Sequence, residues 1–143
     1  MTRILVMLAV GVGMGLAGWA AAHPPTHGTV NVKSLATQDI VEKLDGNVTK
    51  AAFLEVTLEP GQADLPHRHA GPVFGYVLEG EFEWAIDDQP AKVLRAGETF
   101  YEPTGCLHRE AKNPAAKGIT RLLAVILHPR DAKQVTIPEP RQK

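Results

Sequence analysis

Two histidines separated by one residue are the first feature of this sequence that could support chemistry. His67 and His69 lie in the stretch PHRHAGPVFGYVLEG, directly before a run of residues typical of a β-strand. In an extended chain, side chains at positions i and i+2 point to the same side. The two imidazoles would then lie side by side and could occupy neighbouring positions around one metal ion. By itself, however, a pair of this kind more often belongs to an exposed loop.

Glycines, a proline and a third histidine surround this pair at definite intervals. The first stretch reads Gly61-x5-His67-x-His69 and closes at Gly80, and the second reads Gly97-x5-Pro103-x-Gly105-x2-His108. These two spacings resemble the two signature motifs of the cupins, a superfamily of small β-barrels of jelly-roll type. The resemblance covers residues 61–113. It implies an all-β barrel with metal ligands that project into its interior, at the positions of His67, His69 and His108.

Two positions depart from the cupin motifs. Counting seven residues back from Gly80 reaches Val73, where the family has a glutamate ligand, and the alternative spacing reaches Phe74. Neither side chain can bind a metal. In the second motif the asparagine position falls on Lys112, and Asn113 comes one residue late. The sequence therefore predicts a metal ion held by three neutral histidines, without the family's carboxylate.

A three-histidine site has definite chemical properties. Without a carboxylate ligand the ion keeps its full dipositive charge and becomes a stronger Lewis acid toward an anionic or enolate-type ligand. Three protein ligands also leave coordination positions open to water, substrate or oxygen. The sequence leaves the metal open among iron, zinc, manganese, nickel and copper.

The resemblance implies a small molecule as substrate or ligand. We expect a small-molecule enzyme of the dioxygenase, isomerase or hydrolase type, since three-histidine sites occur in some cupin dioxygenases. The alternative is a periplasmic module that binds or senses a small ligand without turnover. A positioned acid or base beside the metal would favour the enzyme, and the candidates are Glu102 and Glu110. Glu102 could act as a catalytic base or a substitute ligand, although a solvated position at a strand edge also fits it.

The elements that would position these residues are short strands. Runs rich in β-formers cover residues 28–35, 51–58, 73–78, 81–86, 91–94, 99–102 and 121–127, with turn signals between them. Residues 37–44 give mixed signals. No long stretch after residue 22 has helical periodicity, which favours an all-β sandwich or barrel. Tyr76, Tyr101 and Trp84 are expected in its core, where strand aromatics usually lie, and His128 is expected to be structural.

The N-terminus predicts export. Arg3, an apolar run over residues 4–17 and the small residues Ala20-Ala21-Ala22 form the layout of a secretory signal peptide. A membrane anchor is the alternative, but the run is shorter than the ~20 residues of a spanning helix. We therefore expect a signal peptide over 1–22 and a cupin domain over 23–143, in the periplasm or secreted, with no membrane attachment after cleavage.

Net charge and cysteine content limit the kinds of binding partner and of disulfide that this chain can have. The net charge of −1 gives no electrostatic reason to bind nucleic acid. Cys106 is the only cysteine, so it cannot pair within the chain. It could be an inert buried thiol, half of an intermolecular disulfide, or a site residue close to His108. We expect a free, buried thiol that binds no metal. The resemblance also implies a homodimer, since cupins often associate through barrel edges.

Overall fold

The computed structural model describes residues 26–44 and 46–140, and all regular structure in these ranges is β-strand. The predicted signal peptide over 1–22 lies outside the described residues. None of the described residues belongs to a helix long and apolar enough to cross a membrane. The strands are β1 (Thr26–His27), β2 (Asn31–Leu44), β3 (Asn47–Leu58), β4 (Gln62–Ala63), β5 (His67–His69), β6 (Val73–Glu79), β7 (Glu81–Ile86), β8 (Lys92–Arg95), β9 (Thr99–Glu102), β10 (His108–Lys112), β11 (Thr120–Pro129) and β12 (Thr136–Pro138).

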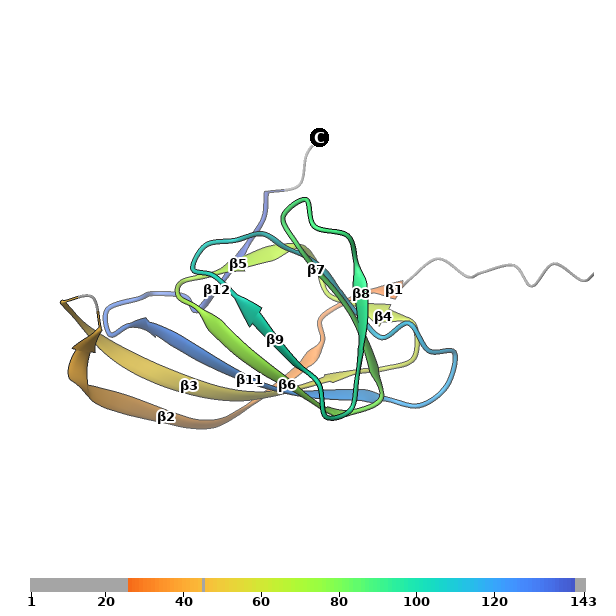
Figure 1. Cartoon of the computed structure of the whole chain (residues 1–143), viewed down its shortest axis with the longest axis horizontal. Coiled ribbons are helices and arrows are strands. Elements are labelled where there is room, and N and C mark those ends of the chain that lie inside the picture. Colours follow the sequence, from red (N-terminus) through yellow and green to blue (C-terminus); the bar gives the residue numbers. More distant parts are fainter. Residues whose placement is uncertain (1–25, 45, 141–143) are drawn as a thin grey trace, which may run out of the picture.

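These strands form two sheets that enclose the core. The five-stranded sheet has the order β2-β3-β11-β6-β9, and the seven-stranded sheet joins β1, β4, β10, β5 and β12 with β7 and β8. In Figure 1 the long strands β2, β3 and β11 run side by side below, and β5 and β7 lie above them. The all-β prediction is confirmed. No described strand pair links one sheet to the other, so the expected closed barrel is wrong.

Alternation along the strands explains which residues fill the interior. On β6, Val73 and Val77 are buried, whereas Phe74 and Tyr76 between them are exposed. On β7, Phe82, Trp84 and Ile86 face inward, as their spacing predicted. Complete burial of one such side chain stabilises the fold by about 1.5–3 kcal/mol. The core residues come from both sheets: Val30, Leu58, Val73, Val77, Phe82, Trp84, Ile86, Phe100, Ala111, Leu122, Ala124 and Ile126.

The structure corrects the expected positions of two tyrosines. Tyr76 and Tyr101 are 42% and 51% exposed, and both lie on the outer face of the five-stranded sheet. Neither tyrosine belongs to the hydrophobic core. Their type favours a strand, but strand propensity does not say which face of the sheet a side chain occupies.

Strand β2 is longer than the sequence indicated. The expected strand ended at residue 35, but β2 continues through the region of mixed signals to Leu44. It forms an antiparallel hairpin with β3, and the turn contains Gly46 at a φ of 78°. Pairing with β3 satisfies the backbone of β2, so tertiary structure overrides the weak local propensity.

A close backbone approach fixes the loop between β5 and β6. A Cβ atom added to Gly71 would lie 1.6 Å from the carbonyl oxygen of Leu127 on β11. Only glycine fits against that strand without moving it. Gly71 therefore sets the path of the chain from His69 into β6.

Candidate metal centre

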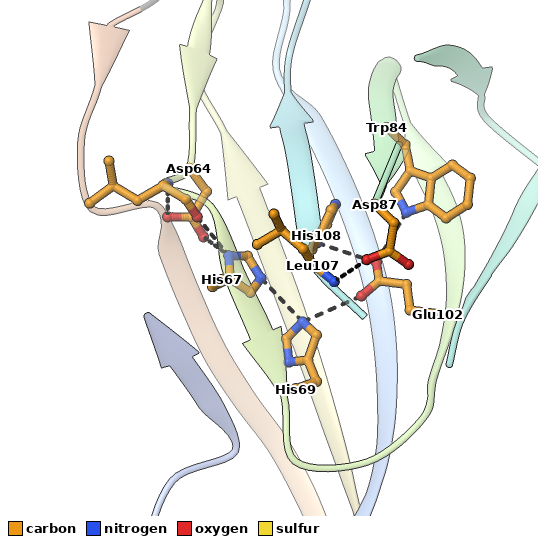
Figure 2. A network of polar contacts seen from close by, with 9 residues as sticks. Asp64, His67, His69, Trp84, Asp87, Glu102, Leu107 and His108 are labelled. Carbon is orange, nitrogen blue, oxygen red and sulfur yellow. Dashed lines mark hydrogen bonds and ion pairs between the residues drawn. The ribbon is translucent and has the colours of Figure 1, made fainter. Parts of the chain in front are cut away.

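The three predicted histidines meet inside the molecule. His67 and His69 lie on β5, and His108 begins β10, which pairs with β5 so that His108 is directly opposite His67. The ligand atoms of the three side chains all lie within 4.8 Å of one another. Figure 2 shows His67 and His69 turned toward each other, with His108 close by. Two segments about forty residues apart in sequence thus contribute to one cluster.

The spacing of the imidazole nitrogens suits one shared ion. Nε2 of His67 lies 3.1 Å from Nε2 of His69. Two nitrogens bound to the same ion at about 2.0–2.1 Å, in neighbouring positions, lie roughly 3 Å apart. Nδ1 of His67 lies 2.7 Å from the carbonyl oxygen of Leu65, to which it donates when it carries the proton. That bond leaves Nε2 of His67 without a proton and free to bind a metal.

Several buried polar atoms without a hydrogen-bond partner gather at this cluster. Nδ1 of His69, both ring nitrogens of His108 and Oε2 of Glu102 are buried and have no hydrogen-bond partner. Buried polar groups are almost always paired, because leaving one unpaired costs about 1–3 kcal/mol. One ion binds one nitrogen of each imidazole, so it could satisfy one nitrogen of His108 together with Oε2 of Glu102, and the residues present fit the ion that the sequence predicts.

The structure decides between the two positions that the sequence left open for Glu102. Instead of lying at a solvated edge, it is 1% exposed, and its carboxylate faces the histidine cluster. Oε1 lies 3.3 Å from Nδ1 of His108, and Oε2 lies 3.6 Å from Nε2 of His69. The solvated position expected for Glu102 is therefore wrong, and this acid lies beside the three histidines.

Glu102 lies on the strand next to Val73, the residue at the position where the cupin motif has its glutamate. Strands β6 and β9 pair so that Val73 is directly opposite Glu102. Both side chains are buried and line the same cavity. Val73 itself is a core residue and offers no ligand atom.

Trp84 holds this carboxylate in place. Its Nε1 donates a hydrogen bond of 3.1 Å to Oε1 of Glu102 (Figure 2). The sequence placed Trp84 in the core, which is confirmed at 7% exposure, but gave no sign of this bond. The only available signal was general: a buried tryptophan usually finds a partner for its N–H.

Burial shifts the pKa values at this site in opposite directions for acids and bases. It raises the pKa of Glu102 to about 7, although the hydrogen bond from Trp84 opposes the shift. It lowers the pKa of His69 to about 4 and that of His108 to about 3, and neighbouring imidazoles add to both effects. Both histidines are consequently neutral at pH 7, the form that binds metal ions.

A β-bulge precedes Asn113. The pairing of β10 with β7 shifts register between His108 and Glu110, which marks the bulge. A bulge inserts one residue into a strand, the same offset by which Asn113 departs from the motif. The Asn113 side chain is fully buried and donates to the carbonyl oxygens of Leu58 and Gly118. Its role is structural, at the far end of β10.

The remaining candidates lie outside the cluster. Glu110 is partly exposed and forms an ion pair with Arg109, so Glu102 is the acid that the structure places beside the histidines. His128 is buried on β11, where its Nδ1 lies 2.8 Å from the Pro129 carbonyl oxygen.

Cys106 is a free thiol in the loop before His108. It is partly rather than fully buried and packs against the hydrophobic core. Burial raises its pKa to about 11, so the thiol stays protonated near neutral pH. Protonated thiols are poor nucleophiles and poor metal ligands.

The cluster forms the polar end of an interior cavity of about 360 Å³. Most of the wall is apolar, and no lysine or arginine is among the described residues that line it. Its polar groups are few and lie mainly at the histidines, with Asp64 beside His67. The lining residues are Thr29, Val30, Val32, Leu54, Val56, Leu58, Asp64, His67, His69, Val73, Phe82, Phe100, Glu102, His108, Ala111, Leu122, Ala124, Ile126 and Thr136.

Comparisons with known proteins agree with this fold. No curated protein matches the chain. A double-stranded β-helix protein from Klebsiella pneumoniae is 19% identical with a TM-score of 0.59, over 80% of this chain and 90% of that one. A cupin superfamily protein from Desulfitobacterium hafniense is 19% identical with a TM-score of 0.53, over 72% and 81%.

A third similar structure is an oxalate oxidase in complex with the substrate analogue glycolate. It is 25% identical with a TM-score of 0.50, over 57% of this chain and 43% of that one. The family model described as "Cupin domain" matches residues 54–126, which include all three histidines and Glu102. With that match over half of its length, the chain belongs to the cupin family.

Proposed function

We propose that this protein is an exported, metal-dependent enzyme that acts on a small organic molecule in its interior cavity. The observation that carries the proposal is the meeting of His67, His69 and His108, whose ligand atoms lie within 4.8 Å of one another at the wall of that cavity. These three residues would hold one divalent transition metal. When bound, the ion supplies Lewis acidity to an oxygen atom of the substrate.

The buried carboxylate favours an enzyme over a binding module. Lewis-acid chemistry on a substrate oxygen commonly needs a nearby group that accepts or donates a proton, or that balances charge. Glu102 lies within 3.6 Å of two of the histidines and is shielded from solvent. A pocket that only stores an apolar ligand gains nothing from burying a carboxylate, which is costly.

The cavity wall indicates the class of substrate. Its surface is mostly apolar, and its polar groups gather at the histidine end. No lysine or arginine is among the described residues of the wall, so a second anionic group would find no positively charged partner among them. We therefore propose a compact substrate with one oxygen-bearing end and an apolar remainder, such as a monocarboxylate or an enolisable ketone. The similarity to an oxalate oxidase in complex with glycolate supports a small organic acid. The lack of a lysine or arginine among the described lining residues argues against a second carboxylate.

Metal analysis combined with a ligand panel tests this function. Protein from its own compartment should contain about one transition metal ion per chain, and His67→Ala, His69→Ala and His108→Ala should each lower that content to near zero. His128→Ala is the matched control and should retain the metal, because His128 lies on β11 outside the cluster.

The panel contains monocarboxylates, enolisable ketones, dicarboxylates and sugar acids, each incubated with oxygen and without it. We expect turnover or binding confined to the first two groups and absent from His108→Ala. Loss of oxygen alongside product would identify a dioxygenase, and product formed without oxygen an isomerase or hydrolase. Saturable binding without any turnover would support the non-catalytic module instead. Full metal content in His108→Ala would refute the site.

A further inference from the structure

We infer that Glu102 supplies a fourth protein ligand, through Oε2, to the metal ion that the three histidines hold. The inference rests on the proposed function, because it concerns the same site. It assigns to a residue of β9 the carboxylate that the cupin motif places on β6.

The two oxygen atoms of Glu102 have different environments. Oε1 accepts the hydrogen bond from Nε1 of Trp84, at 3.1 Å. Oε2 is buried without a hydrogen-bond partner and lies 3.6 Å from Nε2 of His69. A carboxylate that binds a metal through one oxygen commonly has its other oxygen anchored by a hydrogen bond. Glu102 has this arrangement, with Oε2 as the free oxygen.

Distances around His69 place the carboxylate within reach of the same ion. Nε2 of His69 has Nε2 of His67 at 3.1 Å and Oε2 of Glu102 at 3.6 Å. Neighbouring ligand atoms of one first-row metal ion lie roughly 3–4 Å apart, given bond lengths of about 2.0–2.2 Å. His69 therefore faces an imidazole and a carboxylate oxygen (Figure 2), and one ion can span both separations.

The pairing of β6 with β9 explains how a carboxylate on β9 can reach the place that the cupin motif gives to a carboxylate on β6. Val73 and Glu102 are direct partners between β6 and β9. Directly opposite residues on one face of an antiparallel pair have Cβ atoms about 4.5–5.5 Å apart. A carboxylate on either strand can therefore reach the same region of the interior. This chain has the acid on β9 and a hydrophobic residue on β6.

Charge supplies an independent reason. A buried carboxylate is costly unless a cation or several donors compensate it. No lysine or arginine lines the cavity among the described residues, and Trp84 provides the one hydrogen bond to Glu102. A divalent metal ion would supply the missing positive charge, and three imidazoles with one carboxylate would leave a net charge of +1 at the site.

Titration with cobalt tests this inference, because Co²⁺ reports its ligands through its visible absorption. Glu102→Gln preserves shape and removes the charge. It should weaken Co²⁺ binding by more than about tenfold in competition with a chelator, since even partners outside the ligand shell contribute roughly 10–100-fold. The absorption bands should shift as well. Glu79→Gln, an exposed carboxylate paired with Arg121, is the matched control and should change neither.

Relocation of the acid provides a second test. Glu102→Val should weaken Co²⁺ binding, and adding Val73→Glu to that variant should restore most of the lost affinity by returning the carboxylate to β6. Circular dichroism and urea unfolding confirm that each variant folds.

Unchanged affinity and unchanged bands in a folded Glu102→Gln protein would overturn the inference. If histidine variants still lost the metal, the proposed function would stand and Glu102 would act on substrate instead. If His108→Ala kept the metal, the proposed function would fail first. The two failures are therefore distinguishable.

Discussion

Trp84 and Glu102 join the two sheets across the interior, through a hydrogen bond of 3.1 Å from the indole Nε1 to Oε1. Trp84 lies on β7 of the seven-stranded sheet, and Glu102 lies on β9 of the five-stranded sheet. The bond fixes the direction of the carboxylate, so Trp84 acts as a positioning residue.

Trp84→Phe should weaken metal binding without abolishing it. Phenylalanine keeps most of the buried ring and removes the donor, so Glu102 loses its anchor. We expect a roughly tenfold weaker affinity for Co²⁺, within the range typical of such partners, and a shift of the absorption bands. Phe82→Leu is the control for lost aromatic packing, since Phe82 has no donor. Equal affinities for Trp84→Phe and the wild type would show that the bond is dispensable.

In the metal-free protein, the pH dependence of the unfolding free energy should reveal the cost of burying the Glu102 charge. The pKa of Glu102 is raised to about 7 from an ordinary value of 4.5. Between these values the folded protein holds a proton that the unfolded chain has released, so this group's contribution to stability falls as pH rises. With a chelator present, the unfolding free energy of Glu102→Gln minus that of the wild type should therefore rise by about 3 kcal/mol between pH 4.5 and pH 7. Above pH 7 this difference should stay constant.

His69 and His108 act in the opposite direction but do not disturb this comparison. Their pKa values are lowered to about 4 and about 3, so stability falls as pH drops from 6.5 toward those values. The loss is common to both proteins and cancels in the difference. Urea unfolding over pH 4–8 makes the measurement. A constant difference across that range would contradict the expected behaviour of Glu102.

Gly71→Ala should destabilise the fold and disturb the metal centre together. The added methyl group would lie 1.6 Å from the Leu127 carbonyl oxygen, so β11 or the loop after His69 must move. Overpacking of this kind costs about 1–3 kcal/mol or more. Gly28→Ala is the control, because a Cβ atom there meets nothing within 4 Å. The free energy of unfolding in urea and the metal affinity should both fall in Gly71→Ala and stay unchanged in Gly28→Ala.

Cys106→Ser should leave metal content unchanged. The raised pKa of the thiol, about 11, keeps it protonated, and its contacts are with the hydrophobic core. For the same reason the native thiol should react slowly with a disulfide reagent at pH 8 and rapidly after unfolding. Loss of metal in the serine variant would instead identify Cys106 as a ligand.

Export and assembly remain predictions from the sequence. Intact mass of the exported protein should show that residues 1–22 are removed, and a full-length species held in a membrane would contradict a cleaved signal. Light scattering after size exclusion tests the expected homodimer.

The sequence predicted the histidines because their chemistry and spacing are local. The i, i+2 spacing of His67 and His69 and the motif that ends at His108 needed no knowledge of strand pairing. The sequence left Glu102 open between a site residue and a solvated edge for the opposite reason. Its burial depends on β9 pairing with β6 and on Trp84 from β7, and both are long-range relationships. Sheet closure was predicted wrongly because strand patterns do not show which edges pair.

The division of the candidate ligands between two sheets has a consequence for how long the protein survives. His67, His69 and His108 belong to one sheet and Glu102 to the other, and no described backbone ladder connects the sheets. An ion bound to all four side chains would cross-link the two sheets, and its binding free energy would add to the free energy of folding. Proteases cut chains that unfold transiently. The rate at which this protein is degraded would therefore fall as the concentration of available metal in its surroundings rises.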